Sequence, residues 1–240
     1  MSSSAAPKIR AAMGFAAVLL AVFSVRPFVA AAAPRVTASG IALNVPWKMK
    51  IYELARRHFL HPAWGWQHCA RDYLLALRIA RDDHLKIDED ALFAAAFLHD
   101  MATFRPCADR KMEHGACAAL QSPAILKRVG FPRQKIPIVQ QAERGHMYYS
   151  NPGSDPTAIV LHDADSLDFL GDIGVARILS LTGAKAPSFA PAVKTLRGFL
   201  SAIPPRLITP AARRIGSRRV AELRAFLDAL QRETYGGRAM

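Results

Sequence analysis

The sequence predicts a single all-α domain, and three observations support this. Apolar residues recur at helical spacing through most of the chain. No stretch alternates apolar and polar residues as a half-buried strand does, and no Asn-Gly hairpin signal is present. The chain has 240 residues, of which 51% are hydrophobic, enough to form one sizeable core. We expect a helical bundle over residues 45–235, preceded by an N-terminal segment of different character.

The first 33 residues have the pattern of a signal for export. Lys8 and Arg10 give a positive start, residues 11–25 are apolar, and residues 29–33 supply small side chains for cleavage. An apolar run of this length is short for a membrane-spanning helix. We therefore expect an exported protein, periplasmic or secreted. The alternative is a protein anchored in the membrane by residues 11–33.

The first half of the domain contains three predicted helices. Residues 46–60 form an amphipathic pattern that ends at a His-Pro step, and residues 65–83 form a second one with His68 in its first turn. Residues 91–100 are almost wholly apolar and contain no Gly or Pro, which indicates a buried helix. Asp88 or Asp90 is a plausible cap for that helix.

Gly and Pro residues divide the second half into shorter helices. A Gly-Phe-Pro step and a polar turn at residues 148–156 mark two of the breaks. A helix that is dense in aspartate precedes a C-terminal extension, residues 184–235, rich in basic residues. The expected helices are 111–121, 122–129, 132–144, 157–170, 190–202 and 210–233.

The net charge of +13 is unevenly distributed. Residues 1–40 contribute +4 and residues 184–240 contribute +8, so residues 41–183 carry only +1. The chain also lacks the interleaved aromatic and basic residues of a single-strand binding platform. We therefore expect a small-molecule substrate and no nucleic-acid partner. A basic tail of this kind is suited to contact with an anionic membrane surface.

Imidazole and carboxylate groups recur inside otherwise apolar helices. Neutral imidazole together with carboxylate is the ligand mixture of Mn, Fe, Ni, Co or Zn rather than of Mg or Ca. The adjacent pair at the end of the central helix can direct both side chains to one ion, and a helical bundle supplies further ligands from other helices. The candidates are His68, His99, Asp100, His114, His146, and Asp163 or Asp165.

The same residues carry a resemblance to the HD-domain superfamily of metal-dependent phosphohydrolases. It covers residues 64–174 and consists of H-x-x-R from His68, L-H-D ending at Asp100, H-G at His114, and D-A-D-S-L-D-F-L-G at residues 163–171. The resemblance implies that His68, His99, Asp100 and a late aspartate hold the first metal ion. In the family pattern this aspartate follows an alanine, which here identifies Asp165 as the metal ligand. Asp163 remains the alternative.

The resemblance also implies roles in a reaction. Asp100 would orient a water molecule activated by the metal, and His114 and His146 would bind a second ion or the phosphate. Arg71, Lys111 and Arg144 are the cations available for that phosphate. The implied activity is hydrolysis of a phosphomonoester or nucleotide with one or two divalent ions.

Two other functions remain open. The residues after Asp100 include no nearby Gly, and Glu113–Ala116 reads E-H-G-A, so this region resembles the cyanamide hydratase branch of the superfamily. A hydratase or hydrolase of a small substrate without phosphate is the second reading, and a non-enzymatic exported binding protein is the third. The second reading expects an aromatic pocket with few cations, formed by Trp64, Trp66, Phe104, Tyr148 and Tyr149.

Overall fold

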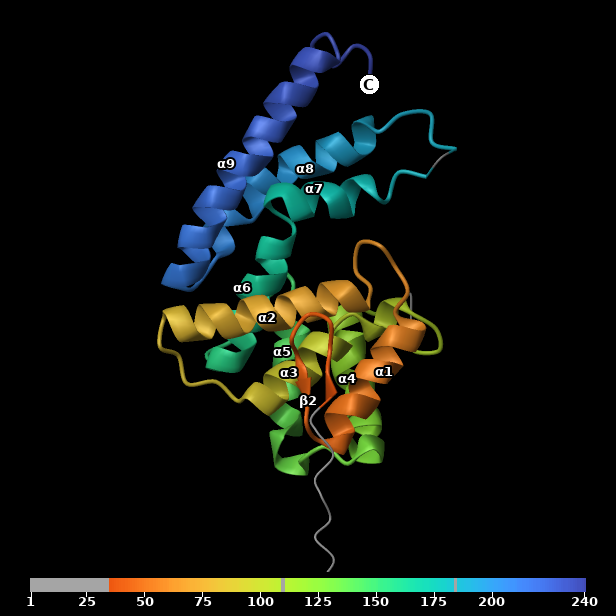
Figure 1. Ribbon diagram of the computed structural model, residues 1–240, viewed down its shortest axis with the longest axis vertical. Helices are drawn as coiled ribbons and strands as arrows, with labels where there is room; N and C mark the ends of the chain where they lie inside the picture. The colour runs from red at the N-terminus through yellow and green to blue at the C-terminus, as the bar shows by residue number, and fades with distance from the viewer. Residues whose placement is uncertain (1–34, 109–110, 184) are drawn as a thin grey trace, which may run out of the picture. The chain divides into compact units, whose positions relative to one another are not determined.

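The computed structural model describes residues 35–108, 111–183 and 185–240 (Figure 1). The described residues all belong to one compact unit. The predicted export segment therefore lies outside the described residues. Among the described helices, none combines the length and the hydrophobicity that a membrane crossing requires.

The all-α prediction is confirmed. The described residues form nine α-helices, three short 3-10 turns and one small antiparallel hairpin of strands β1 (Arg35–Val36) and β2 (Ala42–Leu43). The helices are α1 (Pro46–His58), α2 (Trp66–Asp82), α3 (Glu89–Leu98), α4 (His114–Val129), α5 (Ile136–Gly145), α6 (Pro156–Asp168), α7 (Gly171–Leu179), α8 (Ala190–Ala202) and α9 (Pro210–Glu233). The 3-10 turns are Met101–Thr103, Arg133–Lys135 and Pro204–Arg206.

Helix α3 is the centre of the bundle. Every side chain from Ala91 to Leu98 is buried, and α1, α2, α4, α5 and α6 all contact this helix (Figure 1). Its alanines let neighbouring helices approach closely, and Phe93 and Phe97 fill the remaining space. Because the helix ends inside the bundle, the two residues that follow it, His99 and Asp100, are buried.

The two predicted helices at 111–121 and 122–129 are one helix, α4, which continues through Pro123. Proline has no N–H to donate to the carbonyl four residues earlier, which is that of Ala119. The side-chain amide of Gln140 donates to this carbonyl instead, at 2.7 Å. A contact from α5 thus replaces the missing hydrogen bond, and the sequence of α4 alone does not reveal it.

The hairpin and helix α7 are absent from the sequence prediction. Ile41 and Leu43 of the hairpin are buried in the core, ahead of the predicted start near residue 45. Helix α7 begins directly after α6 and contains Gly174, where an added Cβ would collide with the carbonyl of Phe169. Glycine has low helix propensity, and here it is required for the close approach of α7 to the preceding turn.

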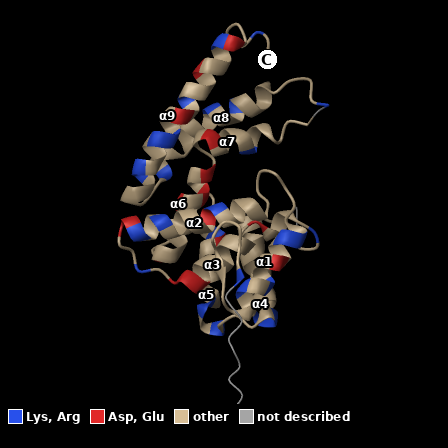
Figure 2. Cartoon of the chain, in the orientation of Figure 1, with Lys and Arg blue, Asp and Glu red and all other residues tan. Residues whose placement is uncertain are grey.

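The basic residues of the C-terminal extension lie largely along α9 (Figure 2). Several of them hold this helix to the rest of the bundle. Arg213 and Arg219 donate hydrogen bonds to the carbonyls of Leu207 and Leu167, and Arg214 forms an ion pair with Asp83 at 3.4 Å. Part of the basic excess is therefore used in packing.

Candidate metal centre

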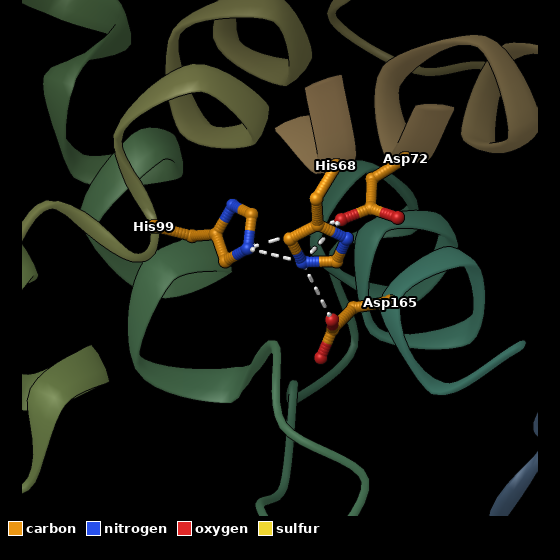
Figure 3. A group of neighbouring side chains, drawn as sticks. All are labelled: His68, Asp72, His99 and Asp165. Atoms are coloured by element: carbon orange, nitrogen blue, oxygen red, sulfur yellow. Dashed lines mark hydrogen bonds and ion pairs between the residues drawn. The ribbon is translucent and has the colours of Figure 1, made fainter. Parts of the chain in front are cut away.

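Three helices bring four ligand-type side chains together in the interior. His68 and Asp72 lie one turn apart on α2, His99 follows the last residue of α3, and Asp165 lies on α6. One ligand atom from each lies within 4.8 Å of the others, and all four side chains are buried. Figure 3 shows them pointing toward one another.

The histidines of this region present Nε2 to the cluster. In each ring the other nitrogen, Nδ1, has an oxygen acceptor, so the neutral imidazole carries its proton on Nδ1 and leaves Nε2 available to a cation. His68 Nε2 and His99 Nε2 then face each other at 3.3 Å. The Nδ1 acceptors are Asp168 Oδ2 for His68 (2.8 Å), the Ala96 carbonyl for His99 (2.9 Å) and the Glu143 carbonyl for His146 (2.6 Å).

Carboxylate oxygens without hydrogen-bond donors complete this cluster. Both oxygens of Asp72 and Oδ2 of Asp165 are buried and accept no hydrogen bond. Buried acceptors without partners are costly, and here they converge with the lone pairs of two imidazoles. A cation satisfies all of them at once, so the residues present fit a divalent metal ion. The mixture of nitrogen and oxygen ligands favours a transition metal.

Asp100 lies between two pairs of histidines. Its Oδ2 is 3.3 Å from His99 Nε2 and 3.6 Å from His68 Nε2. Its Oδ1 is 3.5 Å from His114 Nε2 and 3.8 Å from His146 Nε2, and these two nitrogens are 3.1 Å apart. His99, Asp100 and His146 form a second group with metal-binding geometry. The structure thus brings His114 and His146 to the same centre.

The pKa values reflect an excess of negative charge in this interior. Burial and the nearby carboxylates of Asp168 and Asp165 raise the pKa of Asp72 to about 7. Burial opposes protonation of His99, but the carboxylates around it outweigh this and raise its pKa to about 10. In the metal-free protein, His99 therefore holds a proton that a bound cation would displace.

A family model of the HD domain matches residues 65–170, which include these ligand-type side chains. These residues belong to the HD-domain family. The search of curated proteins gave no match.

Solved structures share the fold of this HD domain. Bacillus subtilis YpgQ, solved in complex with ADP, is 19% identical, and the alignment covers 78% of this chain and 97% of YpgQ with a TM-score of 0.60. A Lactobacillus plantarum protein is 22% identical, with 78% and 96% of the two chains covered and a TM-score of 0.60. A predicted HD superfamily hydrolase from an uncultured Thermotogales bacterium is 23% identical, with 78% and 90% covered and a TM-score of 0.55.

Other predicted site residues of the HD domain lie elsewhere. Asp163 accepts hydrogen bonds from the backbone N–H groups of Ile208 and Thr209, both at 2.8 Å, and so fixes the start of α9. Arg71 donates three hydrogen bonds to Asp168. Lys111 and Arg144 are exposed, on the loop before α4 and near the end of α5.

Three residues of the centre were not predicted from the sequence. Asp72 follows His68 by four residues and Asp168 follows Asp165 by three, so helical spacing places each on the face of a candidate ligand. This spacing is visible in the sequence and could have identified both aspartates. The third residue, Arg177, lies on α7, a helix that was not predicted from the sequence. Its guanidinium is buried and lies 3.1 Å from Asp168.

A cavity of about 250 Å³ adjoins the cluster. Its walls are mainly apolar, and the side chains of Asp100, His114 and Asp165 give it direct access to the centre. Of the expected aromatic residues, Trp64 lines it, whereas Trp66, Phe104, Tyr148 and Tyr149 are not among its lining residues. Neither are Arg71 and Lys111. The lining residues are Trp64, Asp100, Thr103, His114, Met147, Asp165, Phe169 and Arg177.

Proposed function

We propose that this protein is a metal-dependent hydrolase whose substrate enters the cavity beside Asp100. The observation that carries the proposal is the convergence of imidazole Nε2 lone pairs and donor-free carboxylate oxygens at the wall of a cavity. A purely structural core would supply each buried carboxylate oxygen with a hydrogen-bond donor or replace these residues with apolar side chains. A predicted HD superfamily hydrolase is also among the proteins that share the fold.

The first ion would be held by His68, His99, Asp100 and Asp165, with Asp72 as an additional ligand. A second ion would take His114 and His146, and Asp100 would contact both ions because its two oxygens face the two histidine pairs. His68 is oriented for this role by Asp168, a carboxylate–histidine contact of the kind that fixes metal ligands.

A bound divalent ion supplies Lewis acidity and lowers the pKa of a coordinated water molecule. The protein's own residues provide the rest. Asp100 opens onto the cavity, and its carboxylate can accept a hydrogen bond from the attacking water and orient it. The apolar walls formed by Trp64, Met147 and Phe169 exclude bulk water and so strengthen the electrostatic interactions in the site.

For the substrate we propose a phosphoester, a phosphomonoester or a nucleotide. Support comes from the buried guanidinium of Arg177 at the cavity wall and from the binding of ADP by the related fold of YpgQ. The mainly apolar lining favours a second candidate, a small uncharged substrate that is hydrated or hydrolysed. We further propose, from the N-terminal pattern, that the reaction takes place outside the cytoplasm, with contact to an anionic membrane through the basic tail.

The test is a substrate screen on protein loaded with Mn, Fe, Ni, Co or Zn. Phosphate release from phosphomonoesters and nucleotides is measured beside amide formation from small nitriles. We expect turnover of a phosphoester in the wild type and none in His99→Ala. Turnover of a nitrile alone would replace the phosphoester proposal with the second candidate. No turnover of either class, together with no bound metal, would contradict the hydrolase proposal.

A further inference from the structure

Arg177 is the buried cation of the cavity wall. Its side chain is 2% exposed, and it lines the cavity together with Asp100 and Asp165. Both of those carboxylates belong to the proposed metal centre. A buried charge in such a place requires a compensating partner. The partners that the chain supplies show which part of the guanidinium is available to a ligand.

Three contacts hold the guanidinium in a fixed orientation. Its Nε donates to the carbonyl of Ala63, its plane lies against Phe169 with the central carbon 4.3 Å from the ring centroid, and Nη1 is 3.1 Å from Asp168 Oδ2. A planar guanidinium held in this way is ordered in advance to bind oxygen atoms in a defined direction. Arg177 is therefore a rigid part of the wall.

The Nη1 atom of Arg177 has no hydrogen-bond acceptor. It lies 3.1 Å from Asp168 Oδ2 as an ion pair, and that oxygen also accepts hydrogen bonds from His68 Nδ1 and Arg71 Nη2, both at 2.8 Å. A buried N–H donor without an acceptor costs free energy. An oxygen atom of a ligand in the cavity would remove that cost.

The other terminal nitrogen, Nη2, donates a hydrogen bond to His68 Nε2 at 3.3 Å. This is the nitrogen that we assign to the first metal ion. A guanidinium so close to the ion repels it, and the interior weakens that repulsion little because it is shielded from water. An anion that contacts both the ion and the guanidinium is attracted to each of them, and these two attractions offset the repulsion between the two cations.

We propose that Arg177 binds the anionic oxygens of the substrate and thereby makes metal binding and anion binding cooperative. The inference rests on the proposed metal centre and adds to it the residue that selects an anionic substrate over an uncharged one. Cooperativity of this kind is reciprocal, so the metal tightens the anion by the same factor as the anion tightens the metal.

The experiment measures Mn²⁺ binding to the full chain by equilibrium dialysis, with and without inorganic phosphate. For the wild type we expect phosphate to tighten Mn²⁺ binding by about tenfold, and Mn²⁺ to tighten phosphate binding equally. In Arg177→Met we expect a phosphate effect of less than about twofold, with Mn²⁺ alone bound at least as tightly as by the wild type. Arg177→Lys retains the positive charge but lacks the two parallel N–H donors of the guanidinium, so we expect an intermediate effect of phosphate on Mn²⁺ binding.

Arg71→Met is the matched control. Arg71 also pairs with Asp168, to which it donates three hydrogen bonds, but it is not among the residues that line the cavity. This variant therefore loses a comparable ion pair and should retain the phosphate effect. A merely structural role for Arg177 would make the two variants alike.

The outcomes separate this inference from the proposed function. Mn²⁺ binding to the wild type that phosphate does not change would overturn the role of Arg177 and leave the metal centre intact. An equal phosphate effect in the wild type and in Arg177→Met would also overturn it. Absence of Mn²⁺ binding in the wild type would overturn the metal centre itself, and the cooperativity with it.

Discussion

The two ends of helix α3 both carry charged groups, but only one end neutralises them within the chain. At the N-terminal end, Asp88 accepts hydrogen bonds from the N–H groups of Asp90 and Ala91. Lys135 lies 3.0 Å from Asp88 and 2.9 Å from Asp90, and Lys48 lies 3.3 Å from Asp90. Two carboxylates, two ammonium groups and the helix N-terminus satisfy one another.

At the C-terminal end, the corresponding balance is missing. His99 and Asp100 meet Asp72 and Asp165, and three carboxylate oxygens of the latter two residues have no donor. One end of the helix is thus complete as a folded structure, whereas the other is complete only with a cation. The candidate chemistry of this protein is therefore concentrated where the fold leaves polar groups without hydrogen-bond partners, rather than where charges are most numerous.

The largest expected effect is on catalysis at the C-terminal end. His99→Ala or Asp100→Ala should lower kcat/KM for the best substrate by about 10³-fold or more, because metal-ion catalysis supplies several kcal/mol of transition-state stabilisation. Asp90→Asn, at the N-terminal end, should leave the rate within about twofold once correctly folded protein is compared. Steady-state kinetics with fixed metal concentration measure both. Equal losses of kcat/KM in the variants of the two ends would contradict the claim that catalysis depends on the C-terminal end of α3.

Metal binding should also stabilise the fold. At a metal concentration about 100 times the Kd, the expected gain is about 2.7 kcal/mol, or roughly 5–10 °C in Tm for a chain of this size. Removal of the metal with a chelator should reverse the shift. His99→Ala should show no shift, whereas Asp90→Asn should show the full one. A chelator-sensitive shift retained by His99→Ala would place the metal elsewhere.

Asp72→Asn should have opposite effects on stability and on metal binding. Because the pKa of Asp72 is raised to about 7, the metal-free protein holds a buried carboxylate without a donor only above that pH. At such a pH we expect the substitution to stabilise the fold by about 1–3 kcal/mol. The same change should weaken metal binding because a carboxylate ligand is lost. Urea unfolding of chelated protein, followed by dialysis with Mn²⁺, measures both effects. Destabilisation of the metal-free protein by Asp72→Asn would show that this carboxylate is already satisfied.

The smallest effect concerns Asp90 and pH. Although partial burial opposes ionisation, hydrogen bonds from Lys135 and Lys48 lower the pKa of this carboxyl below its usual value. A lowered pKa means that the contribution to stability is present above the unfolded-state pKa and is lost as the pH falls through the folded-state pKa. We expect about 0.2–1 kcal/mol, since the pair is partly exposed.

The check for Asp90 is urea unfolding between pH 3 and pH 7. The difference in stability between the wild type and Asp90→Asn should shrink as the solution becomes more acidic. A difference that does not change with pH would indicate that Asp90 contributes through packing rather than through charge.

The sequence predicts the helical body of the domain well where local pattern decides the structure. The run from Ala91 to Leu98 can only be a buried helix, and its position then forces His99 and Asp100 into the interior. Prediction from the sequence fails where a contact with a residue distant in the chain decides the local structure. Pro123 is tolerated in α4 because of Gln140, and Gly174 lies in a helix because Phe169 requires close packing.

The candidate site shows the same division. His68, His99, Asp100, His114 and His146 could be selected from residue type and order, and the structure brings them together. Residue type left Asp163 and Asp165 as alternatives, because the rotation of α6 decides which of them faces the cluster. In the structure Asp165 lies in the cluster, and Asp163 accepts hydrogen bonds from the start of α9. Arg177 could not be selected, because its place at the cavity depends on the packing of α7.

The most direct test of the metal centre is the metal content of the purified protein by elemental analysis. Wild type, His99→Ala, Asp100→Ala and Asp90→Ala are compared after reloading with Mn, Fe, Ni and Zn. We expect near-stoichiometric transition metal in the wild type and in Asp90→Ala, and none in the two variants at the C-terminal end of α3. No metal in the wild type, or equal metal in all four proteins, would contradict this expectation.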